Sequence, residues 1–385
     1  MSGSAPAVER LRLMLLVPSL QVGGAERQVT LLARHLDPAR YAVTVVTIGA
    51  QDGAADGFAR DLAAAPHVTM ASLGRQGRWD LPGPLRRLVD LLHRERIDVI
   101  HSFLNLASMF GIAAARLTGI PHVSSAIRDG SDPNWLYRVC RLVQARACDV
   151  LVSNSEAGFD SRFRQRRPGF RVIYNGIDLA RFTPDPARDA RLRSELGLTG
   201  FRRVVGMVAT LSVYKDHEAF LAMAARVAAA RPDTGFIVVG DGPLRGIVEA
   251  RRAALGLERS VVLAGRRLDA DHVTQLLDVA CLFTNFRVIE EGLSNSVLEA
   301  MACGIPVVAT HGGGTRELIH EGVEGHLVAD NDAAVAASHV IRLLENDEVR
   351  TAMGRRGREA VESRFSMDGC VQRYEEIYRS ILGRT

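Results

Sequence analysis

Residues 202–242, RRVVGMVATLSVYKDHEAFLAMAARVAAARPDTGFIVVGDG, contain a complete strand–helix–strand unit. The apolar run at 202–211 predicts a buried strand, and residues 217–230 predict a helix. A second apolar run, 235–242, predicts the next strand. Because strands that are separated by helix-length segments form βαβ units, this stretch predicts an α/β protein with a parallel sheet.

The same alternation covers the chain in two blocks. The first block predicts strands at 11–17, 41–48, 97–103, 121–127 and 150–155, and helices at 25–36 and 84–96. The second block adds strands at 260–265, 280–285 and 305–310. A segment rich in turn-forming residues, 174–189, separates the blocks. We therefore predict two Rossmann-like, doubly wound domains, 1–180 and 181–365, which face a cleft and bind ligands at the carboxyl ends of their strands.

The composition narrows the class of protein. The chain has 385 residues, of which 47% are hydrophobic and 24% charged, as in an ordinary globular protein that is too long for one core. A net charge of +4 gives no reason to expect a nucleic-acid partner. Five cysteines without a C-x-x-C pair favour a reducing cytosol, so we expect a cytoplasmic protein.

The sequence predicts no membrane-spanning helix and no signal peptide, because its apolar runs are too short. Any membrane contact is therefore expected to be peripheral, on the inner face of the cytoplasmic membrane. A basic cluster, RFRQRRPGFR at 162–171, has two interpretations. It is either a solvated charged loop or a contact for an anionic membrane surface.

Glycine-rich turns follow several predicted strands. In PSLQVGGAER (18–27), Gly23 and Gly24 would allow a ligand to approach the backbone at the start of a helix, whose N–H groups attract anions. The spacing is not that of a dinucleotide fingerprint, and a tight turn is the alternative. GDGP (240–243) is equally well explained as a turn, and in HGGGTRE (311–317) we expect Thr315 to cap the following helix.

The most specific stretch is IEEGLSNSVLEAMACGIPVVA, residues 289–309. Gly292 at a helix start would free the backbone amides of Leu293 and Ser294 to face a phosphate. Glu299 lies two turns along that helix, where a fixed carboxylate can accept both hydroxyls of a ribose. Together with Glu291 it could instead form a glycosidase pair, but the position after a strand favours nucleotide binding.

Lys215 is the only lysine among 48 basic Lys and Arg residues. A compact ammonium at a strand-to-helix loop suits a phosphate oxygen, although chance survival on the surface is the alternative. The two D-x-D strings, DAD (269–271) and DND (330–332), resemble a metal-binding motif. Both precede predicted helices, so we interpret them as helix N-caps and expect no metal site.

These stretches together resemble the retaining GT-B glycosyltransferases of glycosyltransferase family 4. The resemblance rests on GGAER, SNSEAG, VIYNGID, KDHE, GDGP, EGLSNSVLEAMACGIPVVAT and GGGTREL, which extend from residue 23 to about 318. It implies an acceptor-side first domain, a second domain that holds most of the nucleotide-sugar donor, and a C-terminal helix, 366–385, that crosses back to the first domain. It also implies retention of anomeric configuration, with no cofactor and no required metal.

The resemblance implies roles for individual residues of the second domain. Glu299 would hold the ribose, Glu291 would lie near the donor sugar, and the amides of Leu293 and Ser294 would lie near the pyrophosphate, together with Gly24 of the first domain.

Two further positions concern the base and the diphosphate. The loop that begins at Arg266 would lie near the base. The family usually has an arginine and then a lysine on the diphosphate, but this sequence has Thr210 where the arginine is usual. Lys215 is therefore the main candidate cation.

The first domain departs from the family in another way. Many relatives have a histidine after the G-I-P segment, whereas this sequence has Arg128 nearby. Arg128 would stabilise the departing phosphate or bind the acceptor, and His101 is the other catalytic candidate. A strand-end histidine is more often structural.

The function implied is transfer of a hexose or N-acetylhexosamine from a nucleotide-diphosphate sugar, with UDP as the expected nucleotide. The expected acceptor is a glycan or a lipid-linked acceptor in cell-surface polysaccharide synthesis. Two alternatives share the fold: a UDP-sugar 2-epimerase, and a non-catalytic sugar-nucleotide-binding scaffold in which the missing arginine marks lost catalysis.

Overall fold

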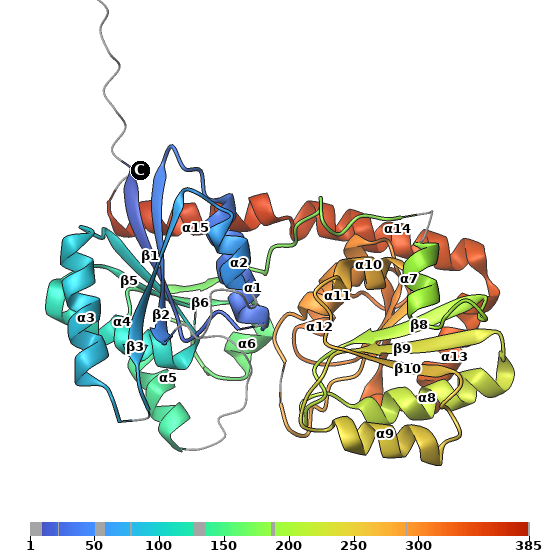
Figure 1. The fold of residues 1–385 in the computed structure, drawn as a ribbon. Helices are drawn as coiled ribbons and strands as arrows, with labels where there is room; N and C mark the ends of the chain where they lie inside the picture. The colour runs from blue at the N-terminus through green and yellow to red at the C-terminus, as the bar shows by residue number, and fades with distance from the viewer. Residues whose placement is uncertain are drawn as a thin grey trace, which may run out of the picture. The chain divides into compact units, whose positions relative to one another are not determined.

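The computed structural model describes residues 10–383 except 22, 51–57, 78, 126–134, 186–188 and 290. It confirms the α/β class, with one parallel sheet of seven strands and one of six (Figure 1). The chain forms two compact units. The first extends to Gly176 and also includes the segment from Met367, whereas the second runs from Ile177 to Ser366. Along the sequence, the chain thus passes from the first unit to the second between residues 176 and 177, a few residues before the predicted boundary at 180.

The first sheet has the strand order β3-β2-β1-β4-β5-β6-β7. Its strands are β1 (Leu11–Val17), β2 (Tyr41–Gly49), β3 (Val68–Arg75), β4 (Val99–Phe103), β5 (His122–Ser125), β6 (Val150–Ser153) and β7 (Phe170–Val172). Its helices are α1 (Gly24–His35), α2 (Phe58–Ala63), α3 (Pro82–Arg94), α4 (Leu104–Thr118), α5 (Trp135–Ala147), α6 (Glu156–Asp160) and α15 (Met367–Ile381). β3 and β7, the two edge strands of this sheet, have no counterpart among the strands that the sequence predicts.

Strand β1 shows why both faces of the first sheet are covered. Leu13 and Leu15 belong to a core that includes residues of α1 and α15, whereas Met14 and Leu16 belong to a core with residues of α3 and α4. Successive strand residues point to opposite faces, so a continuous apolar run needs helices on both sides. Burying each such side chain contributes about 1.5–3 kcal/mol. The C-terminal helix α15, at the red end of the colour scale, packs on α1 near the blue end (Figure 1).

The second sheet has the strand order β10-β9-β8-β11-β12-β13. Its strands are β8 (Arg203–Val208), β9 (Thr234–Val239), β10 (Val261–Gly265), β11 (Val279–Leu282), β12 (Val307–Thr310) and β13 (Gly325–Val328). Its helices are α7 (Ala190–Glu195), α8 (His217–Ala230), α9 (Arg245–Ala254), α10 (Ala270–Gln275), α11 (Asn295–Ala302), α12 (Thr315–Leu318), the 3-10 turn η1 (Ala329–Asn331), α13 (Ala333–Glu345) and α14 (Asp347–Arg364). The strand order reverses between β8 and β11, which makes their carboxyl ends the switch point where α/β sheets bind ligands.

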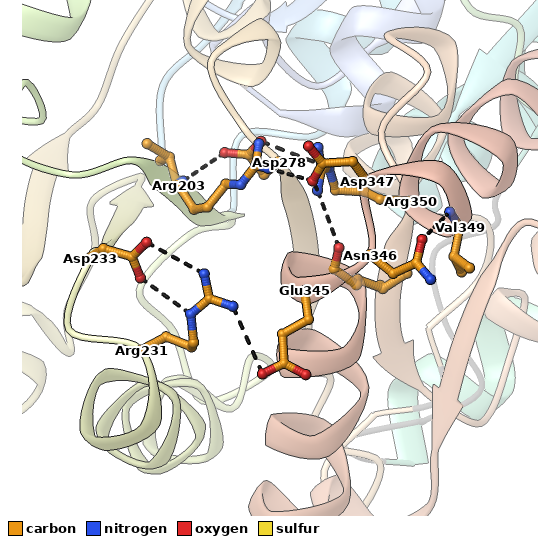
Figure 2. Close-up of polar contacts among 11 residues, drawn as sticks. Arg203, Arg231, Asp233, Asp278, Glu345, Asn346, Asp347, Val349 and Arg350 are labelled. Atoms are coloured by element: carbon orange, nitrogen blue, oxygen red, sulfur yellow. Dashed lines mark hydrogen bonds and ion pairs between the residues drawn. The ribbon is translucent and has the colours of Figure 1, made fainter.

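A buried polar network joins the amino ends of β8 and β11 to the junction of α13 and α14 (Figure 2). The Asp278 side chain, which is fully buried, accepts hydrogen bonds from Arg203 at 3.2 Å and from the backbone N–H of Val204 at 2.8 Å. Arg350 lies 3.8 Å from the same carboxylate. Asp347 accepts from Arg350 at 2.6 Å and also pairs with Arg203. Each buried charge therefore has a partner, as burial requires.

Candidate functional site

The only lysine of the chain and Glu291 meet at the switch point of the second sheet. Lys215 lies between β8 and α8, and Glu291 lies between β11 and α11. The Lys215 Nζ atom donates to both carboxylate oxygens of Glu291, at 2.6 Å from Oε2. The hydroxyl of Thr284 donates to the same Oε2 at 2.5 Å. Two residues that stand out separately in the sequence thus form one ion pair.

Backbone pairing fixes the position of the lysine. Lys215 forms an antiparallel bridge with Thr284, the second residue after β11. The N–H of Asp216 donates to the carbonyl of Phe283 at 2.8 Å, and the N–H of Asn285 donates to the carbonyl of Tyr214 at 3.0 Å. The Asp216 side chain also accepts the N–H of Ala219 and so caps α8. The loop after β8 is therefore held against the loop after β11.

The ion pair is shielded from solvent but still reachable. The exposed fraction of the side chain is 12% for Lys215 and 21% for Glu291. An ammonium has three N–H donors, and Glu291 accepts two of them. The remaining donor can serve a phosphate oxygen, while Glu291 holds the ammonium in place.

The loop 291–294 is fitted against the glycine run 312–314. The N–H of Gly314 donates to the carbonyl of Glu291 at 3.0 Å. A Cβ at Gly314 would lie 2.6 Å from the carbonyl carbon of Gly292, and one at Gly313 would lie 2.1 Å from the Glu291 carbonyl oxygen. The φ of Gly313 is also +48°, which disfavours other residues. The glycines are therefore needed for the close approach of the two loops. The prediction that Thr315 caps α12 is wrong, because Gly314 occupies the N-cap.

Helix α11 begins directly after this loop. Gly292, Leu293 and Ser294 are all buried, and Ser294 occupies the N-cap. The Ser294 hydroxyl lies 3.2 Å from that of Ser296 and does not cap a backbone N–H. Glu299 lies within α11 and is 2% exposed. The amino end of α11 is the positive end of its dipole, which suits an anion.

The other residues of the second unit that were predicted to bind the nucleotide-sugar donor lie just after strands. Thr210 is exposed, and its hydroxyl lies 3.4 Å from that of Ser212. Arg266 is exposed directly after β10. In GDGP, a Cβ at Gly242 would lie 2.4 Å from the carbonyl oxygen of Leu211, so this turn supports the loop that carries Lys215.

In the first unit, Gly23 is the N-cap of α1 and Gly24 is its first residue. The backbone of Gly23 is extended, which any residue can adopt. A Cβ there would overlap the Glu26 carboxylate, the end of a flexible side chain. The geometry thus leaves both interpretations of this turn open. Arg128 lies outside the described residues.

His101 lies on β4 and is completely buried. Its Nδ1 pairs with the hydroxyl of Tyr378 on α15 at 2.6 Å, and its Nε2 pairs with the hydroxyl of Ser125 at 2.7 Å. Burial, together with nearby His122, holds the pKa of His101 well below its usual value, because the charged imidazolium is poorly solvated there. This arrangement favours the structural alternative, in which the ring joins α15 to the sheet.

The two D-x-D strings have different environments. Asp332 caps α13, because its Oδ1 accepts the N–H groups of Ala334 at 2.8 Å and Val335 at 3.2 Å. The prediction of an N-cap is therefore confirmed for this string. In the other string Asp269 also occupies the N-cap of α10, but its carboxylate makes no capping hydrogen bond and pairs instead with Arg267 at 2.7 Å. Those hydrogen bonds from Arg267 lower the pKa of Asp269.

Sequence reasoning missed Thr284 and the surroundings of the ion pair. A mostly apolar cavity of about 350 Å³ lies beside Lys215, and a polar cavity of about 390 Å³ lies beside Thr284. In the polar cavity, the amide of Asn331 donates to Asp216 at 2.8 Å and to the carbonyl of Thr284 at 3.0 Å. Thr284 could have been found in the sequence, because it is a polar residue that closely follows a buried strand.

Two family patterns match the chain. Residues 22–181 match "Glycosyltransferase Family 4", and residues 202–346 match "Glycosyl transferases group 1". The second match includes Lys215, Glu291 and Glu299.

Curated relatives and solved structures give further similarity. The chain is 26% identical over 306 residues to N-acetyl-alpha-D-glucosaminyl L-malate synthase of Bacillus anthracis, covering 77% of this chain and 78% of that protein. It is 25% identical over 304 residues to UDP-Gal:alpha-D-GlcNAc-diphosphoundecaprenol alpha-1,3-galactosyltransferase of Escherichia coli, covering 76% and 77%. The structure of Anabaena HepE in complex with UDP-glucose aligns with a TM-score of 0.82 at 24% identity, covering 96% of this chain and all of that one.

Proposed function

Because the chain belongs to glycosyltransferase family 4, the glycosyl transferases group 1, and has the GT-B fold, we propose that it is a retaining, metal-independent hexosyltransferase. It would move a hexose or N-acetylhexosamine from a UDP-sugar to a glycan or lipid-linked acceptor in cell-surface polysaccharide synthesis. The names of the relatives support this, since one uses UDP-Gal and a diphosphoundecaprenol-linked sugar. The observation that carries the proposal is the Lys215–Glu291 pair beside the amino end of α11.

In the proposed mechanism the protein stabilises the leaving group. The acceptor hydroxyl oxygen attacks the anomeric carbon from the face that the phosphate leaves. The bond between that carbon and the phosphate oxygen breaks, and the acceptor proton passes to the departing phosphate. Lys215 and the amide groups at the start of α11 stabilise the charge that develops on the nucleoside diphosphate. Glu291 positions Lys215 next to the donor sugar.

Binding of the nucleotide is assigned to residues around this centre. Glu299 would accept the ribose hydroxyls, and Arg266 would lie near the base. Leu293 and Ser294 would present their amides to the pyrophosphate, with Gly292 allowing the approach. We leave His101 out of the catalytic set, because both of its ring nitrogens already have partners.

Release of free UDP on addition of acceptor tests the function. A transferase releases UDP only when acceptor is present, and does so in EDTA as well as in magnesium or manganese. A 2-epimerase would isomerise the UDP-sugar without acceptor, and a scaffold would bind it without turnover. Parallel runs with GDP- and UDP-sugars identify the nucleotide. Abolition of transfer by EDTA, with recovery on adding a divalent ion, would overturn the metal-independent mechanism.

Glu299→Gln should weaken UDP binding at least tenfold. The amide keeps the shape of the carboxylate but loses charge-assisted acceptance of the ribose hydroxyls, which contributes about 1.5–3 kcal/mol. Isothermal titration calorimetry of UDP measures the effect. Glu258→Gln, at an exposed glutamate of the same unit, is the matched control and should bind like the parent. Equal UDP affinity in Glu299→Gln would remove Glu299 from the site.

We also propose peripheral contact of the first unit with an anionic membrane surface. None of the helices in the described ranges is long and apolar enough to cross a membrane. Helix α5 nevertheless exposes apolar side chains, including Trp135 at 73% and Leu142 at 48%, next to Arg138 on the same helix. An amphipathic helix of this kind, with arginines beside exposed aromatic residues, suits a membrane interface.

Reversing the charges of Arg164 and Arg167 should weaken binding to anionic vesicles, by about 1 kcal/mol per engaged arginine. Arg166 is left unchanged, because it pairs with Glu156 and with Asp160. Vesicle flotation at low and high salt measures the binding. Arg202→Glu with Arg226→Glu, at exposed positions of the second unit, makes the same change in net charge and should have little effect. If the parent does not float with vesicles at low salt, the surface is not a membrane contact.

A further inference from the structure

We propose that Glu321, His326 and His339 bind a divalent transition-metal ion, Zn²⁺, in the second unit. Glu321 lies in the turn before β13, His326 lies on β13, and His339 lies on α13. One ligand atom from each of the three residues can be chosen so that all lie within 4.8 Å of one another. This inference is independent of the proposed transfer reaction, because none of the three residues is assigned to the donor.

Hydrogen bonds already position two of the three groups. The carboxylate of Glu321 pairs with Nδ1 of His326 at 2.6 Å and accepts the N–H of Leu327 at 2.6 Å. The turn is closed by the N–H of Gly322, which donates to the carbonyl of Gly325 at 2.8 Å. Because β13 is an edge strand, its outer side is not covered by a further strand. The pair is thus fixed at the edge of the sheet.

The third group comes from the helix that follows. The imidazole rings of His326 and His339 stack, with centroids 4.1 Å apart and an angle of 17° between their planes. The side chain of His326 is 10% exposed, whereas that of Glu321 is 53% exposed. The group is therefore buried on one side and open to solvent on the other, which gives an ion a path of entry.

Two imidazoles and one carboxylate form a ligand set that Zn²⁺ binds, with water as the fourth ligand. At metal–ligand distances of about 2.0–2.2 Å, ligand atoms in a tetrahedral site lie roughly 3.3–3.5 Å apart. A separation of 4.8 Å, the upper limit for these atoms, must close by about 1.3–1.5 Å, and the 2.6 Å contact between Glu321 and Nδ1 of His326 must open by less than about 1 Å. Rotations of the partly exposed Glu321 and His339 side chains can supply both changes.

The ion would connect the turn, the edge strand and α13. Directly after β13, Asn331 in η1 donates to Asp216 and to the carbonyl of Thr284. Thr284 in turn donates to Glu291. A metal at His326 would therefore stabilise the segment from β13 to Asn331, which ends beside the Lys215–Glu291 pair. The metal itself would not contact the nucleotide-sugar donor.

Zinc titration of metal-stripped protein by calorimetry tests the site. We expect one Zn²⁺ per chain for the parent, and at least tenfold weaker binding for His339→Gln and for Glu321→Gln. Both variants change partly exposed side chains, so their melting temperatures without zinc show whether they fold. Zinc should raise the melting temperature of the parent by several degrees and leave that of His339→Gln nearly unchanged.

His320→Gln is the matched control, because His320 lies beside the site but pairs with Glu324 at 3.1 Å. It should bind zinc like the parent. Unchanged affinity in His339→Gln, no binding by the parent, or a loss confined to His320→Gln would each overturn the assignment. Transfer activity, measured separately in EDTA, reports on the proposed function and not on this site.

Discussion

Lys215→Ala is expected to lower kcat by about 10²–10³-fold, equivalent to about 2.7–4 kcal/mol of transition-state stabilisation. The ammonium is held by Glu291 in the loop between β8 and α8, where its remaining N–H group is available to a phosphate oxygen. That contact strengthens as negative charge develops on the departing nucleoside diphosphate, so its loss should affect kcat more than binding. The UDP-release assay first identifies the nucleotide-sugar donor. Steady-state kinetics with that donor then measure kcat and KM.

Lys215→Arg tests shape separately from charge. The side chain of Lys215 is 12% exposed and pairs with both oxygens of one carboxylate, so a planar guanidinium has to displace its neighbours. Turnover should fall at least tenfold. Arg251→Ala is the control, since Arg251 lines the same cavity but pairs with the exposed Glu218. Kinetics of Lys215→Arg within twofold of the parent would show that the lysine has no special role.

A double-mutant cycle with Glu291→Gln distinguishes two roles of the lysine. If Lys215 only neutralises Glu291, removing the lysine from the Glu291→Gln variant should have little further effect. If Lys215 contacts the phosphate, Lys215→Ala should still lower kcat in that background. Residues in direct contact commonly have interaction energies of about 0.5–3 kcal/mol, which is large enough for steady-state kinetics to detect.

The central strands were predictable from sequence, whereas three edge strands were not. β1 and β8 are buried on both faces, and such strands appear as continuous apolar runs. β3, an edge strand, has only one buried residue among eight, and β7 and β13 have three and four residues. β3 and β7 leave most of their residues at least partly exposed, and β13 begins with a glycine and a histidine, so none of the three shows the apolar run or clear period that predicts a strand.

Two residues of the candidate site, Lys215 and Glu291, stand out in the sequence, whereas Thr284 and the contacts among the three do not. Lys215 stands out as the only lysine, and Glu291 stands out through its spacing from Glu299 and through the family resemblance. Their ion pair depends on the antiparallel bridge between Lys215 and Thr284, a tertiary contact between loops that are far apart in sequence. In the same way, Asp269 occupies the predicted N-cap of α10, but its carboxylate pairs with Arg267 instead of a backbone N–H, a choice that depends on side-chain geometry.

The largest loss of stability is expected at the opposite end of the second sheet, at Asp278 (Figure 2). Its buried carboxylate faces Arg203 and Arg350, whose side chains are 12% and 10% exposed. Removing Asp278 leaves both arginines with only the largely exposed Asp347 as a carboxylate partner, and breaking a buried ion pair typically costs about 3–5 kcal/mol. The backbone N–H of Val204 would lose its acceptor as well.

Asp278→Ala should therefore lower the melting temperature of the second unit by on the order of 10 °C, as expected for this size of unit. Asp233→Ala is the matched control in the same region (Figure 2), because Asp233 is 38% exposed and pairs with Arg231 near the surface. An exposed pair contributes less than about 1 kcal/mol, so the control should melt within a few degrees of the parent. Below its melting temperature, the folded Asp278→Ala protein should keep the kcat of the parent, because the network joins the amino ends of the strands and Lys215 follows a carboxyl end. Equal melting of the two variants would show that the buried network adds no more stability than a surface pair.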